Sequence, residues 1–166
     1  LDRSDDDVIK QYKINAGLVH DQVNDIAFDS AGRGWIASGD YFSGGIQVLN
    51  PGASLSSTSD DMWATFTSLN SPLPGAYVTS IAVDNTGSAW IGTTTGAARL
   101  EYGSNPFQIS DDRWSVFHAG SSGLMYDNVR DILVDRAGNV WFALLILGVS
   151  VRTPDGTWQT FQQDDG

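Results

Sequence analysis

The chain has no cysteine, only two lysines and a single glutamate, Glu101, among its 166 residues. Without cysteine, neither disulfide bonds nor thiolate chemistry can contribute to the protein. Glutamate and lysine are good helix formers, whereas the abundant aspartates and the 18 glycines favour turns. The composition therefore predicts an all-β protein with many tight turns.

Basic residues and long apolar runs are also scarce. The formal net charge is −11, and the nine lysines and arginines are scattered. A nucleic-acid-binding face needs clustered basic side chains, so we expect no nucleic-acid partner. The longest apolar run, Val140 to Leu147, is far shorter than the roughly 18 residues of a membrane span, so we expect no span in this segment. The chain begins at Leu1 and shows no signal peptide, as we expect of a processed product or a piece of a longer protein.

The tryptophans follow a pattern that is repeated three times. Trp35, Trp90 and Trp141 each end an Asp-x-x-Gly-x-x-Trp phrase, at a spacing of just over 50 residues. The other three, each placed three residues before a phenylalanine, are Trp63, Trp114 and Trp158. Repetition at this spacing, in segments rich in β-type residues, indicates a repeat architecture. A tryptophan that recurs at one strand position packs between neighbouring sheets, so we expect all six in the core.

Each repeat contains four short strands separated by turn signals, at residues 23–67, 78–117 and 129–161. A further strand at residues 8–14 matches the fourth strand of a unit whose first three strands are missing. Four-stranded repeats select a β-propeller, whose ring needs typically 4–8 blades. We therefore predict a single partial β-propeller over residues 1–166. It consists of three four-stranded antiparallel blades plus one extra N-terminal outer strand, and it forms an incomplete ring on its own.

Three arrangements would resolve the incomplete ring. The chain could be part of a longer propeller, or two copies could form a closed homo-oligomer of about six blades. The extra strand could instead join a neighbouring molecule head to tail and so build an open fibre. The sequence leaves these alternatives open.

The second and third repeats resemble a known family. The phrases VTSIAVDNTGSAWIGTTTG and VRDILVDRAGNVWFALLILGVSVRTPDGTWQTF are similar to the two-component regulator propeller repeat. The resemblance covers nearly the whole chain from Val8 to Phe161 and rests on structural positions. It implies the extracytoplasmic sensor part of a bacterial signalling protein, or a related secreted propeller, and hence an extracellular or periplasmic location. It also implies binding of a ligand or partner without catalysis in the propeller.

In an antiparallel four-strand meander the turns sort into two ends. The end formed by the first-to-second and third-to-fourth turns collects aspartates, namely Asp29, Asp60, Asp61, Asp84, Asp111, Asp112, Asp135 and Asp155. Such carboxylates could bind calcium, but the Asp-x-x-Gly spacing equally fits a hydrogen-bonded turn, and the chain contains no known calcium motif. We therefore expect a structural role for these aspartates, no metal site and no cofactor.

The opposite end, formed by the second-to-third turns and the links between units, is the predicted binding surface. Its candidate residues are Tyr41, Phe42, Tyr77, His118, Tyr126, Leu144, Leu145, Ile146 and Leu147. Aromatic rings on loops offer flat faces to a sugar or a protein partner, and an exposed apolar tip is typical of an interface. The alternative for the tyrosines is packing against neighbouring loops. The stretch 144–147 could likewise pack between blades or extend its strands.

These features predict a non-catalytic propeller module that binds a ligand, such as a glycan, or a protein partner. The alternative is a structural protein whose blades assemble into a closed homo-oligomer, or into a fibre by strand donation. No Ser/His/Asp order and no histidine-rich metal cluster is present in the sequence. His118 near Asp127 is the one place where the chemistry of a propeller lyase would be sought. We therefore expect no enzyme activity.

Overall fold

The computed structural model describes residues 11–12, 14, 17–53 and 57–163, and within them the protein is built from β-strands. Three antiparallel sheets of four strands each follow one another along the chain. The strands are β1 (Val23–Phe28), β2 (Gly34–Gly39), β3 (Gly44–Asn50), β4 (Met62–Phe66), β5 (Val78–Val83), β6 (Ser88–Thr93), β7 (Gly96–Glu101), β8 (Arg113–Phe117), β9 (Val129–Val134), β10 (Val140–Leu144), β11 (Val149–Arg152) and β12 (Trp158–Phe161). We call β1–β4 blade 1, β5–β8 blade 2 and β9–β12 blade 3.

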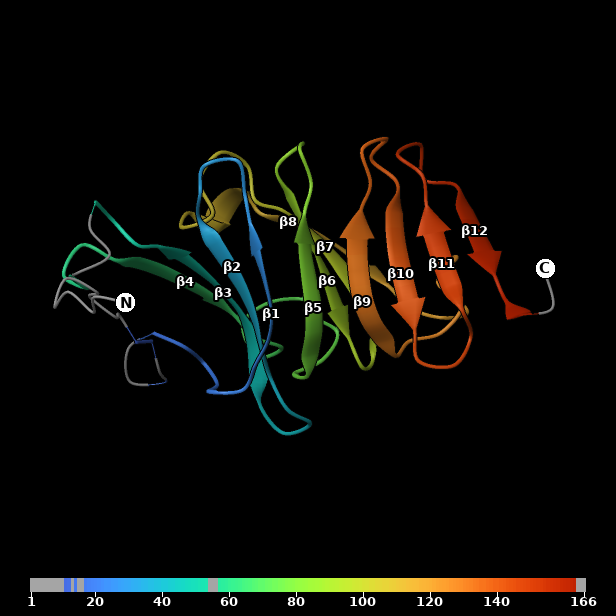
Figure 1. Ribbon diagram of the computed structural model, residues 1–166, viewed down its shortest axis with the longest axis horizontal. Helices are drawn as coiled ribbons and strands as arrows, with labels where there is room; N and C mark the ends of the chain where they lie inside the picture. The colour runs from blue at the N-terminus through green and yellow to red at the C-terminus, as the bar shows by residue number, and fades with distance from the viewer. Residues whose placement is uncertain (1–10, 13, 15–16, 54–56, 164–166) are drawn as a thin grey trace, which may run out of the picture.

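The three blades stand in a row, with blade 1 and blade 3 at opposite ends (Figure 1). Each blade is a meander in which every strand pairs with the next one along the chain. The first strands of the blades, β1, β5 and β9, are neighbours and form the inner side of the row. The predicted fold class is therefore confirmed: the described chain is all-β and consists of propeller blades that do not close into a ring.

Most of the extra strand predicted at residues 8–14 lies outside the described residues. Tyr12, which is described, is not in a strand, and its ring packs edge-on against Trp63 of β4 at a centroid distance of 5.3 Å. Phe66 of blade 1 makes the same kind of contact with Trp114 of blade 2, at 5.7 Å. The ring of Tyr12 therefore packs on the fourth strand of blade 1 as the ring of Phe66 packs on the fourth strand of blade 2.

Hydrophobic cores fill the two interfaces between blades. Trp35 of β2 is fully buried in the first core, and Trp90 of β6 is buried in the second. Trp141 of β10, the third member of this series, remains 38% exposed, because no described blade covers its face. The expectation that all six tryptophans lie in the core is therefore wrong at Trp141.

Polar contacts join the inner strands of neighbouring blades. The side-chain amide of Asn24 donates a hydrogen bond to the carbonyl oxygen of Val78, at 2.7 Å. The hydroxyl of Thr79 likewise donates to the carbonyl oxygen of Val129, at 2.7 Å. Because Asn24 and Thr79 take the same place in β1 and β5, the repeated contact sets the spacing of the blades at this end of the inner strands.

The turns lie at two ends of the blades, as the meander requires. The β1–β2, β5–β6, β9–β10 and β11–β12 turns lie at the top of Figure 1, and we call this the turn end. The β2–β3 and β10–β11 turns lie at the bottom together with the links between blades, and we call this the loop end. In the part of the chain that the structure describes, no helix is long and apolar enough to cross a membrane.

Candidate functional site

The β2–β3 turn at the loop end is held by its own backbone and one carboxylate. Gly39 has a φ of +129°, and a Cβ atom there would lie 2.8 Å from the carbonyl oxygen of Ala76, so only glycine fits. One carboxylate oxygen of Asp40 accepts the backbone N–H groups of Phe42 at 2.8 Å and Ser43 at 3.0 Å. These two hydrogen bonds lower the pKa of Asp40. The turn therefore presents its tip in a fixed conformation.

Three of the predicted binding residues lie at or beside this tip. Phe42 is 93% exposed, and Tyr41 beside it is also largely exposed. The ring of Tyr41 packs edge-on against Tyr77, at a centroid distance of 4.9 Å. Because Tyr77 belongs to the link between blades 1 and 2, residues far apart in the sequence form one aromatic group. We call Tyr41, Phe42 and Tyr77 the aromatic tip.

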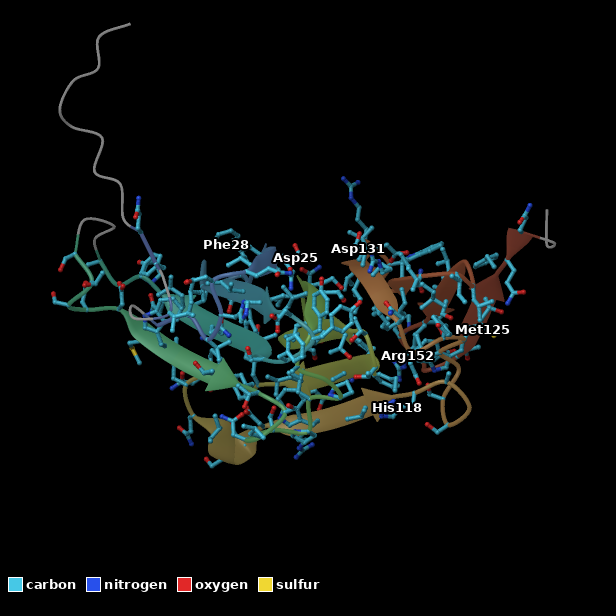
Figure 2. All side chains as sticks on the ribbon, turned by 90° about the horizontal axis from the view of Figure 1, so that it is seen from below. Asp25, Phe28, His118, Met125, Asp131 and Arg152 are labelled. Carbon is cyan, nitrogen blue, oxygen red and sulfur yellow. The ribbon has the colours of Figure 1, made fainter. Side chains whose placement is uncertain are left out.

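A polar hollow lies beside the aromatic tip, at the loop end of the inner strands. Its volume is about 200 Å³, and Asn24, Tyr77, Thr79 and Arg130 line it. The Tyr77 hydroxyl and the Arg130 guanidinium offer hydrogen-bond donors, while Asn24 and Thr79 offer oxygen acceptors, because their own donors already join the blades. Figure 2 views the molecule from this side, and the inner strands run along one edge of it, marked by Asp25 and Asp131. An aromatic tip next to a hollow with convergent polar groups can hold a small polar ligand.

The remaining predicted residues lie near blades 2 and 3. His118 is partly exposed on the outer side of the molecule (Figure 2), and its Nδ1 atom lies 3.7 Å from a carboxylate oxygen of Asp127. The same carboxylate accepts the backbone N–H of Ala119 at 2.7 Å, which fixes the link. Tyr126 is half-buried and packs against the second core. The structure therefore places His118 beside Asp127, the pair that the sequence analysis singled out.

The apolar stretch 144–147 divides into buried and exposed side chains. Leu144 ends β10 and is buried, and its backbone N–H donates to the carbonyl oxygen of Gly148 at 3.0 Å. Leu147 packs against the second core. Leu145 and Ile146 remain exposed at the β10–β11 turn. Two of the four side chains are thus structural, and two are available at the loop end.

The aspartates of the turn end bind backbone and indole N–H groups. Asp29 accepts the indole N–H of Trp35 at 3.1 Å, and Asp84 accepts that of Trp90 at 2.9 Å. Burial by itself raises the pKa of Asp84, but hydrogen bonds from Thr86 and Trp90 outweigh it and lower the pKa. In the described part of the chain, no three His, Cys, Asp or Glu side chains gather closely enough to hold a metal ion.

Asp112 differs from the other aspartates of the turn end. Both of its carboxylate oxygens are buried and have no hydrogen-bond partner among the described residues. Burial and the neighbouring charge of Asp111 raise the pKa of Asp112 to about 6. This carboxyl group therefore takes up its proton at a higher pH than an ordinary aspartate does.

Sequence reasoning missed two groups of polar residues. The hollow residues Asn24, Thr79 and Arg130 stand at the second position of each inner strand. Comparison of that position between repeats could have identified them. Arg99 and Arg152 line a second cavity, between blades 2 and 3. The sequence feature that could have identified these two arginines is a charged residue at a strand position where the other repeats have an apolar one.

Comparison with known proteins agrees with the fold. Residues 72–95 match the family model of the two component regulator propeller. No curated protein matches the chain. The matched segment runs from the link before blade 2 through β5 and β6, and so includes the second Asp-x-x-Gly-x-x-Trp phrase.

Solved propeller structures resemble the whole row of blades. The extracellular domain of a B. thetaiotaomicron protein named as a hybrid two component system matches with a TM-score of 0.70 and 23% identity, over 95% of this chain and 19% of its own. PorZ, a surface component of the type-IX secretion system of Porphyromonas gingivalis, matches with a TM-score of 0.69 and 19% identity, over 89% and 22%. Virginiamycin B lyase from Staphylococcus aureus matches with a TM-score of 0.55 and 16% identity, over 85% and 41%.

At these identities the likeness shows the fold alone, and the chain spans about a fifth of the length of the first two structures. The lyase likeness therefore assigns no chemistry to His118. The resemblance predicted from the sequence is confirmed by the family match: residues 72–95 match the two component regulator propeller, and they lie within a row of propeller blades.

Proposed function

We propose that the protein is a non-catalytic propeller module that binds a ligand at its loop end. The observation that carries the proposal is the aromatic tip beside the polar hollow, with Phe42 almost fully exposed. Aromatic faces stack on the apolar faces of sugar rings, while amides, hydroxyls and guanidinium groups bind their hydroxyls. A glycan is therefore the ligand class that this surface suits best.

We infer that the module works outside the cytoplasm, in the extracellular space or the periplasm. The family match supports sensing, and the B. thetaiotaomicron structure is the extracellular domain of a protein named as a two component system. The PorZ structure is that of a bacterial surface component. In this proposal the loop end recognises a ligand and passes its occupancy to other parts of a signalling protein.

Removing the rings of the aromatic tip tests the proposal. We expect Phe42→Ala and Tyr41→Ala each to weaken binding on a glycan array by at least about fivefold, because each stacked ring contributes on the order of 1 kcal/mol or more. The melting temperature of Phe42→Ala should stay within about 2 °C of the unchanged protein, because the ring is exposed and contributes little to packing.

Phe28→Ala is the matched control for these variants. Phe28 is another exposed phenylalanine, but it ends β1 at the turn end, on the inner edge of the molecule (Figure 2). Its removal should leave the array signal unchanged. A large loss of stability in Phe42→Ala, or equal losses of binding in the Phe42 and Phe28 variants, would contradict a site at the loop end.

A second candidate function is self-assembly, which the exposed outer faces of blades 1 and 3 favour. Ile26 of blade 1 is 52% exposed, whereas Ile81 in the same position of blade 2 is 3% exposed because blade 1 covers it. Trp141 and Leu133 face outward from blade 3, while Trp90 in blade 2 is covered. Exposed apolar blade faces of this kind favour association.

A polar group on blade 3 has the same arrangement as one that joins blades 1 and 2. In blade 1, one oxygen of Asp25 accepts the N–H of Ile26 at 2.8 Å, and the other accepts the N–H of Ile81 in blade 2 at 2.9 Å. In blade 3, one oxygen of Asp131 accepts the N–H of Ile132 at 2.9 Å. Asp131 also lines a surface hollow with Leu133 and Trp141, the residues that face outward from blade 3. The first blade of a second copy is the occupant that we propose.

Light scattering after size-exclusion chromatography tests this assembly. The unchanged protein should grow in mass between about 5 and about 200 μM, because association follows mass action. Leu133→Asp should abolish the growth, since it places a charge in the apolar contact. Ile109→Asp, which changes an equally exposed residue at the turn end, should not. A monomer at every concentration would exclude assembly through these faces.

A further inference from the structure

The interface between blades 1 and 2 is filled by apolar side chains at the turn end. Val48 pairs across the sheet with Trp35, and Leu100 of blade 2 lies in the same core. Both side chains are fully buried. Tyr102 covers the indole of Trp35 at a centroid distance of 4.7 Å. The positions of Val48 and Leu100 in this interface are therefore filled by apolar side chains.

The interface between blades 2 and 3 carries two arginines at the equivalent positions. Arg99 pairs with Trp90, as Val48 pairs with Trp35. Arg152 pairs with the residue before Trp141, as Leu100 pairs with the residue before Trp90. The guanidinium carbons of Arg99 and Arg152 lie 5.2 and 5.7 Å from the ring centroid of Trp90. Two cations thus replace two apolar side chains, in a protein with a net charge of −11.

The partners of the two guanidinium groups differ. Arg99 forms an ion pair with Glu101 at 2.7 Å and donates a hydrogen bond to the hydroxyl of Ser88 at 3.0 Å. Arg152 has no carboxylate within 4.0 Å among the described residues. Its one hydrogen bond runs to the carbonyl oxygen of Thr153, at 3.5 Å. Burial and the nearby charge of Arg99 lower the pKa of Arg152, so the protein leaves this charge poorly compensated.

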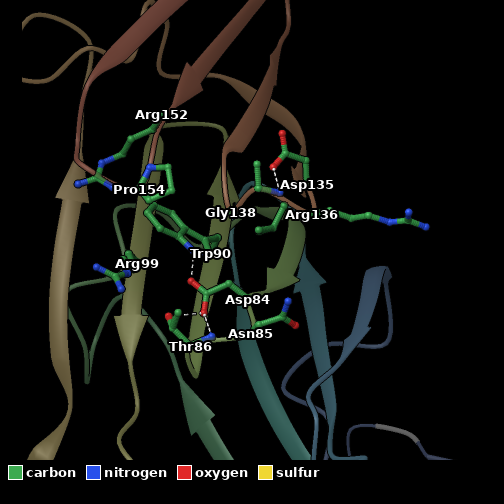
Figure 3. A pocket seen from close by; sticks show the side chains of 12 residues that line it. Asp84, Asn85, Thr86, Trp90, Arg99, Asp135, Arg136, Gly138, Arg152 and Pro154 are labelled. Carbon is green, nitrogen blue, oxygen red and sulfur yellow. Dashed lines mark hydrogen bonds between the residues drawn. The ribbon is translucent and has the colours of Figure 1, made fainter.

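The two arginines line a cavity of about 360 Å³. Its walls are the β5–β6 turn, the β9–β10 turn and Pro154. In Figure 3 both guanidinium groups lie on one side of Trp90, and Asp135 and the outward-pointing Arg136 lie on the other. The carboxylate of Asp135 accepts the indole N–H of Trp141 at 3.0 Å and so is occupied within its own blade. Asp84, which also lines the cavity, accepts the indole N–H of Trp90 in the same way, and Arg99 and Arg152 are the two guanidinium groups beside Trp90.

We propose that this cavity binds a small organic carboxylate, held by Arg152 and Arg99 above Trp90. A carboxylate accepts two parallel hydrogen bonds from one guanidinium group, and its charge offsets the repulsion between the two arginines. The volume accommodates a molecule up to the size of a monosaccharide acid. This site lies at the turn end and is independent of the ligand proposed for the loop end.

Calorimetric titration with acetate and with glucuronate tests the proposal, with the arginine Nε–H resonances followed in parallel by NMR. We expect dissociation constants on the order of 1 mM for a two-arginine site that is open to solvent on one side. Arg152→Met keeps the aliphatic stem over Trp90 and should weaken binding at least about tenfold. Arg152→Lys keeps the charge but loses the planar fork, and should weaken binding about threefold.

Arg136→Met is the matched control, because it removes the same charge from the rim of the cavity. It should change the affinity by less than about twofold. Glucose, which is neutral, should not titrate. Absence of saturable binding up to about 50 mM, or equal losses in the Arg152 and Arg136 variants, would overturn the site. Binding of sulfate without binding of either carboxylate would overturn the assignment of the ligand class.

Discussion

Trp35→Ala should lower the free energy of unfolding by about 3–5 kcal/mol, as expected for truncating a fully buried aromatic residue. Trp35 fills the interface between blades 1 and 2, where its indole packs on Tyr102 at 4.7 Å. Its indole N–H also donates to the buried carboxylate of Asp29. The substitution therefore removes apolar packing and leaves an acceptor without its partner. Urea unfolding followed by circular dichroism measures the loss.

Trp141→Ala is the matched control for this prediction, because it changes the same strand position in blade 3. Trp141 is 38% exposed and makes the equivalent hydrogen bond, to Asp135 at 3.0 Å. Its truncation should cost no more than about 1–2 kcal/mol, since water replaces part of what is lost. Equal losses for the two variants would show that the face of blade 3 is covered in solution.

Asp29→Ala should lower the free energy of unfolding by about 2–4 kcal/mol at neutral pH, because it leaves buried donors without an acceptor. The Asp29 side chain is fully buried. Its carboxylate accepts hydrogen bonds from the backbone N–H of Ala31 at 2.9 Å and of Arg33 at 3.0 Å, and from the Arg33 guanidinium at 2.6 Å. Chemical denaturation at pH 7 measures the effect. Asp135→Ala, whose hydrogen bonds are more open to water, should cost less.

The pH dependence of stability gives a second measurement of Asp29. Burial alone raises the pKa of Asp29, but hydrogen bonds from Trp35 and Arg33 and the charge of Arg33 lower it below the ordinary value of 3.8. A lowered pKa in the folded state means that the stabilisation is present above about pH 4. It is lost as the pH falls through the folded value. Asp29→Ala should therefore reduce the loss of stability between about pH 4 and about pH 2. If the free energy of unfolding of the variant falls with pH in this range as steeply as that of the unchanged protein, this role is contradicted.

The strand pattern was readable from the sequence because it depends on local chemistry. Alternating β-branched and aromatic residues, with Asp and Gly at the turns, define the strands in each repeat. The Asp-x-x-Gly-x-x-Trp phrase encodes a contact within one hairpin. The aspartate closes the turn by accepting a backbone N–H, and it also accepts the indole N–H of the tryptophan six residues later. Asp84 does both, with the N–H of Ser88 and the indole of Trp90. A contact that is contained in a few successive residues can be predicted from them.

The candidate site was predictable only in part. The meander rule places Tyr41 and Tyr77 at the same end, but the contact between their rings depends on how blade 2 stands against blade 1. The division of the stretch 144–147 has the same origin. Leu144 and Leu147 turn toward the second core, and their neighbours turn away from it. Whether one side chain in such a stretch is buried depends on where the neighbouring sheet lies, and the local sequence does not give that position.

The repeat, the four strands of each unit and the turn chemistry follow from the sequence, because these depend on residues close together in the chain. Which of the equivalent residues are covered follows from the packing of the blades. Trp35 and Trp141 stand in the same phrase, yet one is buried and the other is exposed, because a second blade packs on the first and no described blade packs on the second. This packing also brings Arg99 and Arg152 together across an interface. Contacts between sheets join residues about 50 positions apart, so the arrangement of the blades, and not the local sequence, determines them.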